Sequence, residues 1–190
     1  LTELKKKAEK TPEEYAAFWE NFGAVLKEGI YEDQPNREKI LEVSRFQTTA
    51  SDGLRSLSDI VADMKEGQDA IYYITGDNLE TVRQSPQLEG FRSRGVEVLL
   101  MTDPVDEFWL PAVGSFEDKP FKSVTRGGAD LDNIKEEDAD KDTKDKKKKD
   151  KKQAPGIDEL IASLKISLGD AVKDVAVSER LTDSPVCLVS

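Results

Sequence analysis

The sequence contains no histidine, and Cys187 is the only cysteine among its 190 residues. Without histidine there is no Ser-His-Asp triad, no Cys-His pair and no histidine-ligated metal site. A single cysteine excludes an intrachain disulfide and suits a reducing compartment such as the cytosol. No apolar run approaches the roughly 18 residues that a membrane-spanning helix needs, and no signal peptide is visible.

Basic residues are also scarce. Lys and Arg number 28 against 39 acidic residues, so the net charge is −11 and the isoelectric point lies near 4.7. A surface of this sign repels phosphate backbones and anionic membranes, so we expect neither nucleic acid nor membrane as a partner. The length allows one full domain and part of a second.

The first third of the sequence is predicted to be helical. Thr11, Pro12 and Glu14 form a helix-start signature with Thr11 as the N-cap. Apolar residues then recur at helical spacing, and Gly29 is the predicted end of this helix. Residues 54–64 predict a second amphipathic helix.

Two strands separated by a helical stretch follow. Residues 70–75 and 96–101 are rich in apolar and β-branched residues, as in parallel strands that are covered on both faces. Asp77 or Asn78 can cap the short helix that comes after the first strand. This order predicts a right-handed βαβ unit, and residues 121–125 predict a further strand.

The composition changes abruptly at residues 135–152, which are almost entirely Lys, Asp and Glu. This run predicts a charged linker, and it lacks the glycine and the final glutamate of an EF-hand loop. A helix is predicted after Gly156, followed by strands over 172–178 and 185–189. The predicted fold class is therefore α/β, with helices followed by a short, mainly parallel sheet, then the linker and a truncated α+β piece.

An acidic and aromatic stretch follows the strand at 96–101, at the edge where parallel sheets usually bind ligands. Asp103, Asp106 and Glu107 are candidates for a cation site or an acid–base pair, although capping and surface roles are favoured because no histidine or phosphate loop accompanies them. Adjacent helical residues point about 100° apart. We therefore expect either Phe108 or Trp109 in the core and the other at least partly exposed.

Several stretches, in this order, closely resemble the heat-shock protein 90 family of chaperones, most of all its bacterial form. The resemblance covers nearly the whole chain except the lysine-rich run. It rests on YAAFWENFGAVLKEGIYEDQPNREKI, SRFQTT, IYYITG, SPQLEGFRSRGVEVLLMTDPVDEFWL, KPFKSV and SERLTDSPVCLV.

The resemblance implies a fragment of a larger, ATP-dependent protein. It implies the second half of the middle domain at 1–128, built of connecting helices and a small αβα three-layer unit. It also implies a linker at 129–155 and the start of the C-terminal domain at 156–190. The ATP-binding domain would precede the fragment and the dimerisation helices would follow it. We therefore expect no ATPase activity and no cofactor in the fragment, ATP and Mg²⁺ in the full-length parent, a homodimeric parent, and a cytoplasmic location.

The resemblance also implies a role in binding unfolded or partly folded client proteins. By position it assigns client contact to Glu107 and Phe108, with Trp109 adjacent. The family often has Trp directly after Asp-Glu, whereas this sequence has Phe there and Trp next. The alternative is a stand-alone α/β enzyme, or a scaffold, with an acidic site at Asp103, Asp106 and Glu107.

Overall fold

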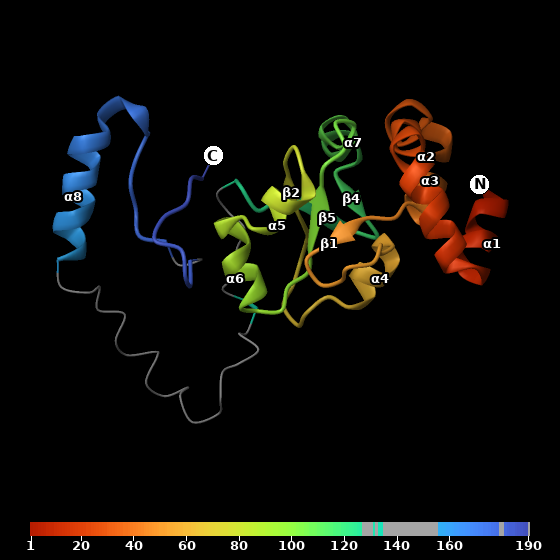
Figure 1. The fold of residues 1–190 in the computed structure, drawn as a ribbon, viewed down its shortest axis with the longest axis horizontal. Coiled ribbons are helices and arrows are strands. Elements are labelled where there is room, and N and C mark those ends of the chain that lie inside the picture. Colours follow the sequence, from red (N-terminus) through yellow and green to blue (C-terminus); the bar gives the residue numbers. More distant parts are fainter. Residues whose placement is uncertain (127–130, 132, 135–155, 179–180, 190) are drawn as a thin grey trace, which may run out of the picture.

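The computed structural model describes residues 1–126, 131, 133–134, 156–178 and 181–189 (Figure 1). Most of the predicted linker, including the lysine-rich run, lies outside these residues. A group of helices at one end is followed by a five-stranded sheet with helices on both faces. Among the described helices, none is both long and apolar enough to cross a membrane.

The connecting helices are α1 (Thr2–Lys10), α2 (Pro12–Glu32) and α3 (Arg37–Val43), with the 3₁₀ turn η1 (Gln34–Asn36) between the last two. The apolar face of α2 predicted from the sequence packs Tyr15 and Trp19 against α1 and α3.

The structure differs from the sequence prediction at both ends of α2. Helix α2 starts after Thr11 as expected, but the Thr11 hydroxyl donates backward to the Lys7 carbonyl (3.2 Å) and does not cap α2. Gly29 does not end the helix, which continues to Glu32. A Cβ at Gly29 would lie 2.9 Å from the Ile40 side chain. Gly29 therefore allows α3 to approach α2 closely.

The sheet has the strand order β1-β3-β2-β5-β4. Its three central strands, β3, β2 and β5, are parallel, and the short strands β1 and β4 add antiparallel edges. The predicted βαβ unit is therefore present. The bounds are β1 (Gln47–Thr48), β2 (Ile71–Thr75), β3 (Val98–Met101), β4 (Ser115–Phe116) and β5 (Lys119–Ser123).

One face of the sheet is covered by α5 (Leu79–Arg83), the 3₁₀ turn η2 (Pro86–Leu88) and α6 (Glu89–Arg92). The predicted cap of α5 is present, since the Asn78 side chain accepts a hydrogen bond from the Thr81 amide (2.9 Å). On this face Leu88 and Phe91 pack under the strands.

The opposite face is covered by α4 (Leu57–Ala62) and α7 (Asp106–Val113), together with parts of α2 and α3. Leu99 and Met101 of β3 point to this face, while Val98 and Leu100 point to the other. Side chains alternate along a strand, so β3 contributes to both cores, as its continuous apolar sequence predicted.

The C-terminal stretch contains α8 (Ile157–Leu168), as predicted, and the 3₁₀ turn η3 (Gly169–Ala171). The strand predictions for 172–178 and 185–189 are wrong, because the structure shows no strand there. Both segments have strand-like apolar residues, but a strand also needs the hydrogen bonds of a neighbouring strand. Within the described ranges, no strand pairs with them.

Candidate functional site

The acidic and aromatic stretch forms the turn after β3 and the helix α7. The Asp106 amide donates to the Asp103 carbonyl (2.9 Å), which turns the chain into α7, and the Asp103 amide donates to Asp106 Oδ2 (3.2 Å). Two acids near the first turn of a helix also complement its positive end. The helix therefore starts in a defined orientation at the carboxyl edge of the parallel strands.

Trp109 is the aromatic residue of the pair that lies in the core. Its side chain is fully buried (0% exposed). Its ring lies 6.0 Å from that of Phe46 and meets the Phe121 ring edge to face, with 5.6 Å between ring centroids. The indole Nε1 donates to Asp106 Oδ1 (2.8 Å). Trp109 thus anchors α7 to the sheet by both packing and a hydrogen bond.

A buried lysine of α2 completes this anchor. Lys27 Nζ lies 2.8 Å from Asp106 Oδ1, 3.1 Å from Asp106 Oδ2 and 2.8 Å from Asp103 Oδ2. It also lies 5.3 Å from the centroid of the Phe46 ring. Lys27 and Asp106 are 5% and 0% exposed. The ion pair therefore joins the connecting helices to α7 in a site shielded from water.

Phe108 lies on the opposite side of α7. It follows Asp106 by two positions, which is a rotation of about 200° around a helix, and it is 62% exposed. Glu107, Pro111 and Ala112 are exposed as well. The outer face of α7 therefore presents an aromatic ring beside small apolar side chains and one carboxylate.

The interpretation of all three acids as capping or surface residues is wrong for Asp106, which is buried and paired. Asp103 does not cap α7 with its side chain, since it binds Lys27. Of the acids, Glu107 is the exposed one. Sequence reasoning missed Lys27 altogether: it lies 79 positions before Asp106, and nothing in its local sequence marks it as a partner.

This arrangement does not fit an acidic catalytic or metal site. The carboxylates of Asp103 and Asp106 are directed at Lys27, whose positive charge occupies the place that a divalent cation would need. Across the described ranges, no three His, Cys, Asp or Glu side chains are grouped to hold a metal ion.

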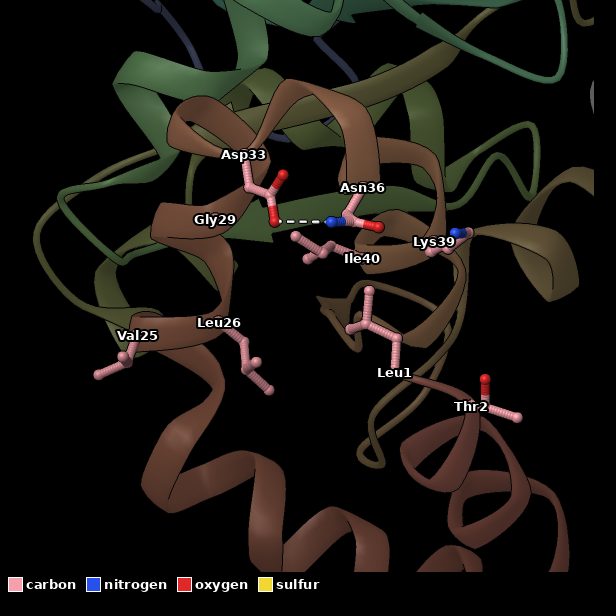
Figure 2. A pocket seen from close by; sticks show the side chains of 9 residues that line it. All are labelled: Leu1, Thr2, Val25, Leu26, Gly29, Asp33, Asn36, Lys39 and Ile40. Carbon is pink, nitrogen blue, oxygen red and sulfur yellow. Dashed lines mark hydrogen bonds between the residues drawn. The ribbon is translucent and has the colours of Figure 1, made fainter.

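A cleft lies away from α7, among the connecting helices (Figure 2). Its volume is about 540 Å³. The apolar side chains of Val25, Leu26 and Ile40 line it, and an Asp33–Asn36 hydrogen bond of 2.9 Å crosses its rim. None of the predicted site residues lines this cleft.

The fold and the sequence together define the class of protein. The family model described as Hsp90 protein matches residues 1–190, and the chain belongs to the Hsp90 family. The chain is 57% identical over 190 residues to a protein of Roseobacter denitrificans named Chaperone protein HtpG. A Rhizobium meliloti protein of the same name is 51% identical over 191 residues. The predicted family, in its bacterial form, is confirmed.

These two relatives are much longer. Each match covers the whole of this chain but only 30% and 29% of the relative. Among solved structures, the middle domain of a Plasmodium falciparum heat shock protein matches with a TM-score of 0.60 and 31% identity. That match covers 65% of this chain and 52% of the other. The matched part of this chain therefore shares the fold of that middle domain.

Proposed function

We propose that the chain is the part of an ATP-dependent Hsp90 chaperone that contacts unfolded or partly folded client proteins. The proposed contact surface, called here the α7 outer face, consists of Glu107, Phe108, Pro111 and Ala112. Trp109, predicted to adjoin this surface, holds the helix from the core side. The observation that carries the proposal is the 62% exposure of Phe108 on a helix whose other aromatic ring is fully buried.

Rigidity and charge both suit the α7 outer face to client binding. An exposed ring offers a large apolar area to an unfolded segment, and the fixed helix beneath it adds little ordering cost on binding. The buried contacts of Lys27, Asp106 and Trp109 supply that rigidity. A net charge of −11 and the neighbouring Glu107 counteract association between copies of the chaperone itself.

Fluorescence anisotropy of a labelled, permanently unfolded protein tests this proposal. Phe108→Ser should weaken binding, because it removes the exposed ring and leaves Trp109 in place. Phe22→Ser is the matched control: Phe22 is 54% exposed, but it lies on α2 and stacks on Phe18. If both variants weaken binding equally, or if neither weakens it, the assignment to α7 is contradicted. Circular dichroism checks that each variant remains folded.

The domain organisation is part of the proposal. Residues 1–128 are assigned to the second half of the middle domain, 129–155 to a linker and 156–190 to the start of the C-terminal domain. The solved middle domain, which covers 65% of this chain, supports the first assignment. Limited proteolysis should cut first within 129–155, and early cleavage inside the sheet would contradict these boundaries.

The remaining assignments follow from the proposed place in a longer chaperone. ATP binding, Mg²⁺ binding and homodimerisation are assigned to parts of the parent outside this chain, and the cytoplasm is its proposed location. We expect the purified chain to hydrolyse no ATP. The test measures phosphate release from ATP in the presence of Mg²⁺. ATP hydrolysis that copurifies with the chain and rises with its concentration would refute the expectation.

A further inference from the structure

The carboxylate of Glu89, the first residue of α6, receives hydrogen bonds from a loop that lies 93 to 95 positions later in the sequence. Glu89 Oε2 accepts from the amides of Thr182 (2.8 Å) and Asp183 (3.0 Å). Oε1 accepts from the Ser184 amide (3.1 Å) and from the Ser184 hydroxyl. Three successive amides thus converge on one carboxylate, which is how backbone loops bind anions.

The carboxylate is well matched to this loop. The Ser184 hydroxyl and the amides of Asp183 and Thr182 lower the pKa of Glu89 to about 2. Hydrogen bonds to an ionised acceptor are stronger than bonds between neutral groups. At neutral pH Glu89 is therefore ionised, which is the form that accepts these hydrogen bonds most strongly.

A second contact lies close by in the sequence. The side-chain Nε2 of Gln87, in η2, donates to the carbonyl of Leu188. Gln87 and Glu89 lie two positions apart, and both bind main-chain groups of the C-terminal stretch. Leu88 and Phe91, which flank Glu89, are fully buried in the core. Glu89 therefore projects from a rigid support.

We propose that Glu89 and Gln87 form a latch that fastens residues 182–188 to the αβα unit, so that the C-terminal stretch and the sheet move as one body. The latch lies on the α5–α6 face of the sheet, whereas α7 covers the opposite face. Strand β3 connects the two, because it follows α6 and leads into α7. The latch itself does not depend on what α7 binds.

Hydrogen–deuterium exchange of the full chain tests the latch. Glu89→Ala removes the shared acceptor, so the amides of residues 182–184 should exchange at least about tenfold faster. Amides of β2 and β3 should be unchanged, which shows that the sheet remains folded. Glu80→Ala is the matched control, since it removes an equal charge from the exposed surface of α5. Unchanged exchange at 182–184 in Glu89→Ala, or equal acceleration in Glu80→Ala, would overturn the proposal.

The reactivity of Cys187, the single cysteine, gives a second readout of the latch. Cys187 lies between the two latch contacts and is partly buried. In Glu89→Ala the segment should be released, so Cys187 should react severalfold faster with a thiol reagent. In Ser184→Ala the increase should be smaller, because that variant keeps the three amide donors. If Glu89→Ala fails to fold, a carboxyl titration of wild-type Glu89 with a midpoint near its ordinary value would overturn the latch.

Discussion

Replacing Lys27 with Met tests the anchor of α7 most severely. Met has a similar length and no charge, so the change removes the cation and leaves the cavity nearly filled. Asp106, which is 0% exposed, would keep the indole donor of Trp109 and the amide of Asp103 but lose its counterion. Removing one partner of a buried ion pair costs about 3–5 kcal/mol. Asp103 is 39% exposed at its side chain and can turn to water, which favours the lower end of that range.

The assay is urea denaturation followed by the fluorescence of the two tryptophans, Trp19 and Trp109. In a double variant, Asp106→Asn removes the uncompensated charge while its amide oxygen still accepts from Trp109. We therefore expect Lys27→Met with Asp106→Asn to be more stable than Lys27→Met alone. A Lys27→Met variant within about 1 kcal/mol of the wild type, the range of exposed ion pairs, would refute the reasoning. So would the absence of coupling between the two changes.

Three further outcomes are expected. Gly67→Ala should lower the free energy of unfolding by more than about 1 kcal/mol, because Gly67 has a φ of +86° and an added Cβ would lie 2.4 Å from the Asn133 carbonyl oxygen. Tyr15→Phe should cost about 1 kcal/mol, since the buried hydroxyl donates to the Val43 carbonyl (2.7 Å); urea denaturation measures both. The carboxyl of Glu89 should titrate by NMR near pH 2. The pKa of Glu89 is depressed in the folded state, so the latch should be fully stabilised above pH 4.5, the ordinary pKa of Glu. This stabilisation should be lost as the pH falls toward 2.

Features determined by neighbouring residues could be predicted from the sequence. The strands at 70–75 and 96–101 were predictable because their apolar runs are short and bounded by turns, and β2 and β3 lie there. The Asn78 cap was predictable because a capping side chain binds an amide three residues later. The 100° step along a helix separated Phe108 from Trp109, but it could not assign which ring is buried.

Features determined by distant residues could not be predicted. Lys27 pairs with Asp106 across 79 positions, and the Glu89 contacts with residues 182–184 span more than 90. The packing of the whole domain determines such partners. The local sequence does not distinguish a charged residue that is buried and paired from one that is exposed. Gly29 was misjudged for the same reason, since its role is set by Ile40 of the next helix.

Photo-crosslinking from position 108 tests most directly whether the α7 outer face contacts clients. A photoreactive benzoylphenylalanine at position 108 should crosslink to a labelled protein that is kept unfolded. It should fail to crosslink to the same protein in its native fold. The same residue at position 22, which is also exposed, should give little product. Equal crosslinking from both positions, or none from 108 under conditions where binding is seen, would contradict the account.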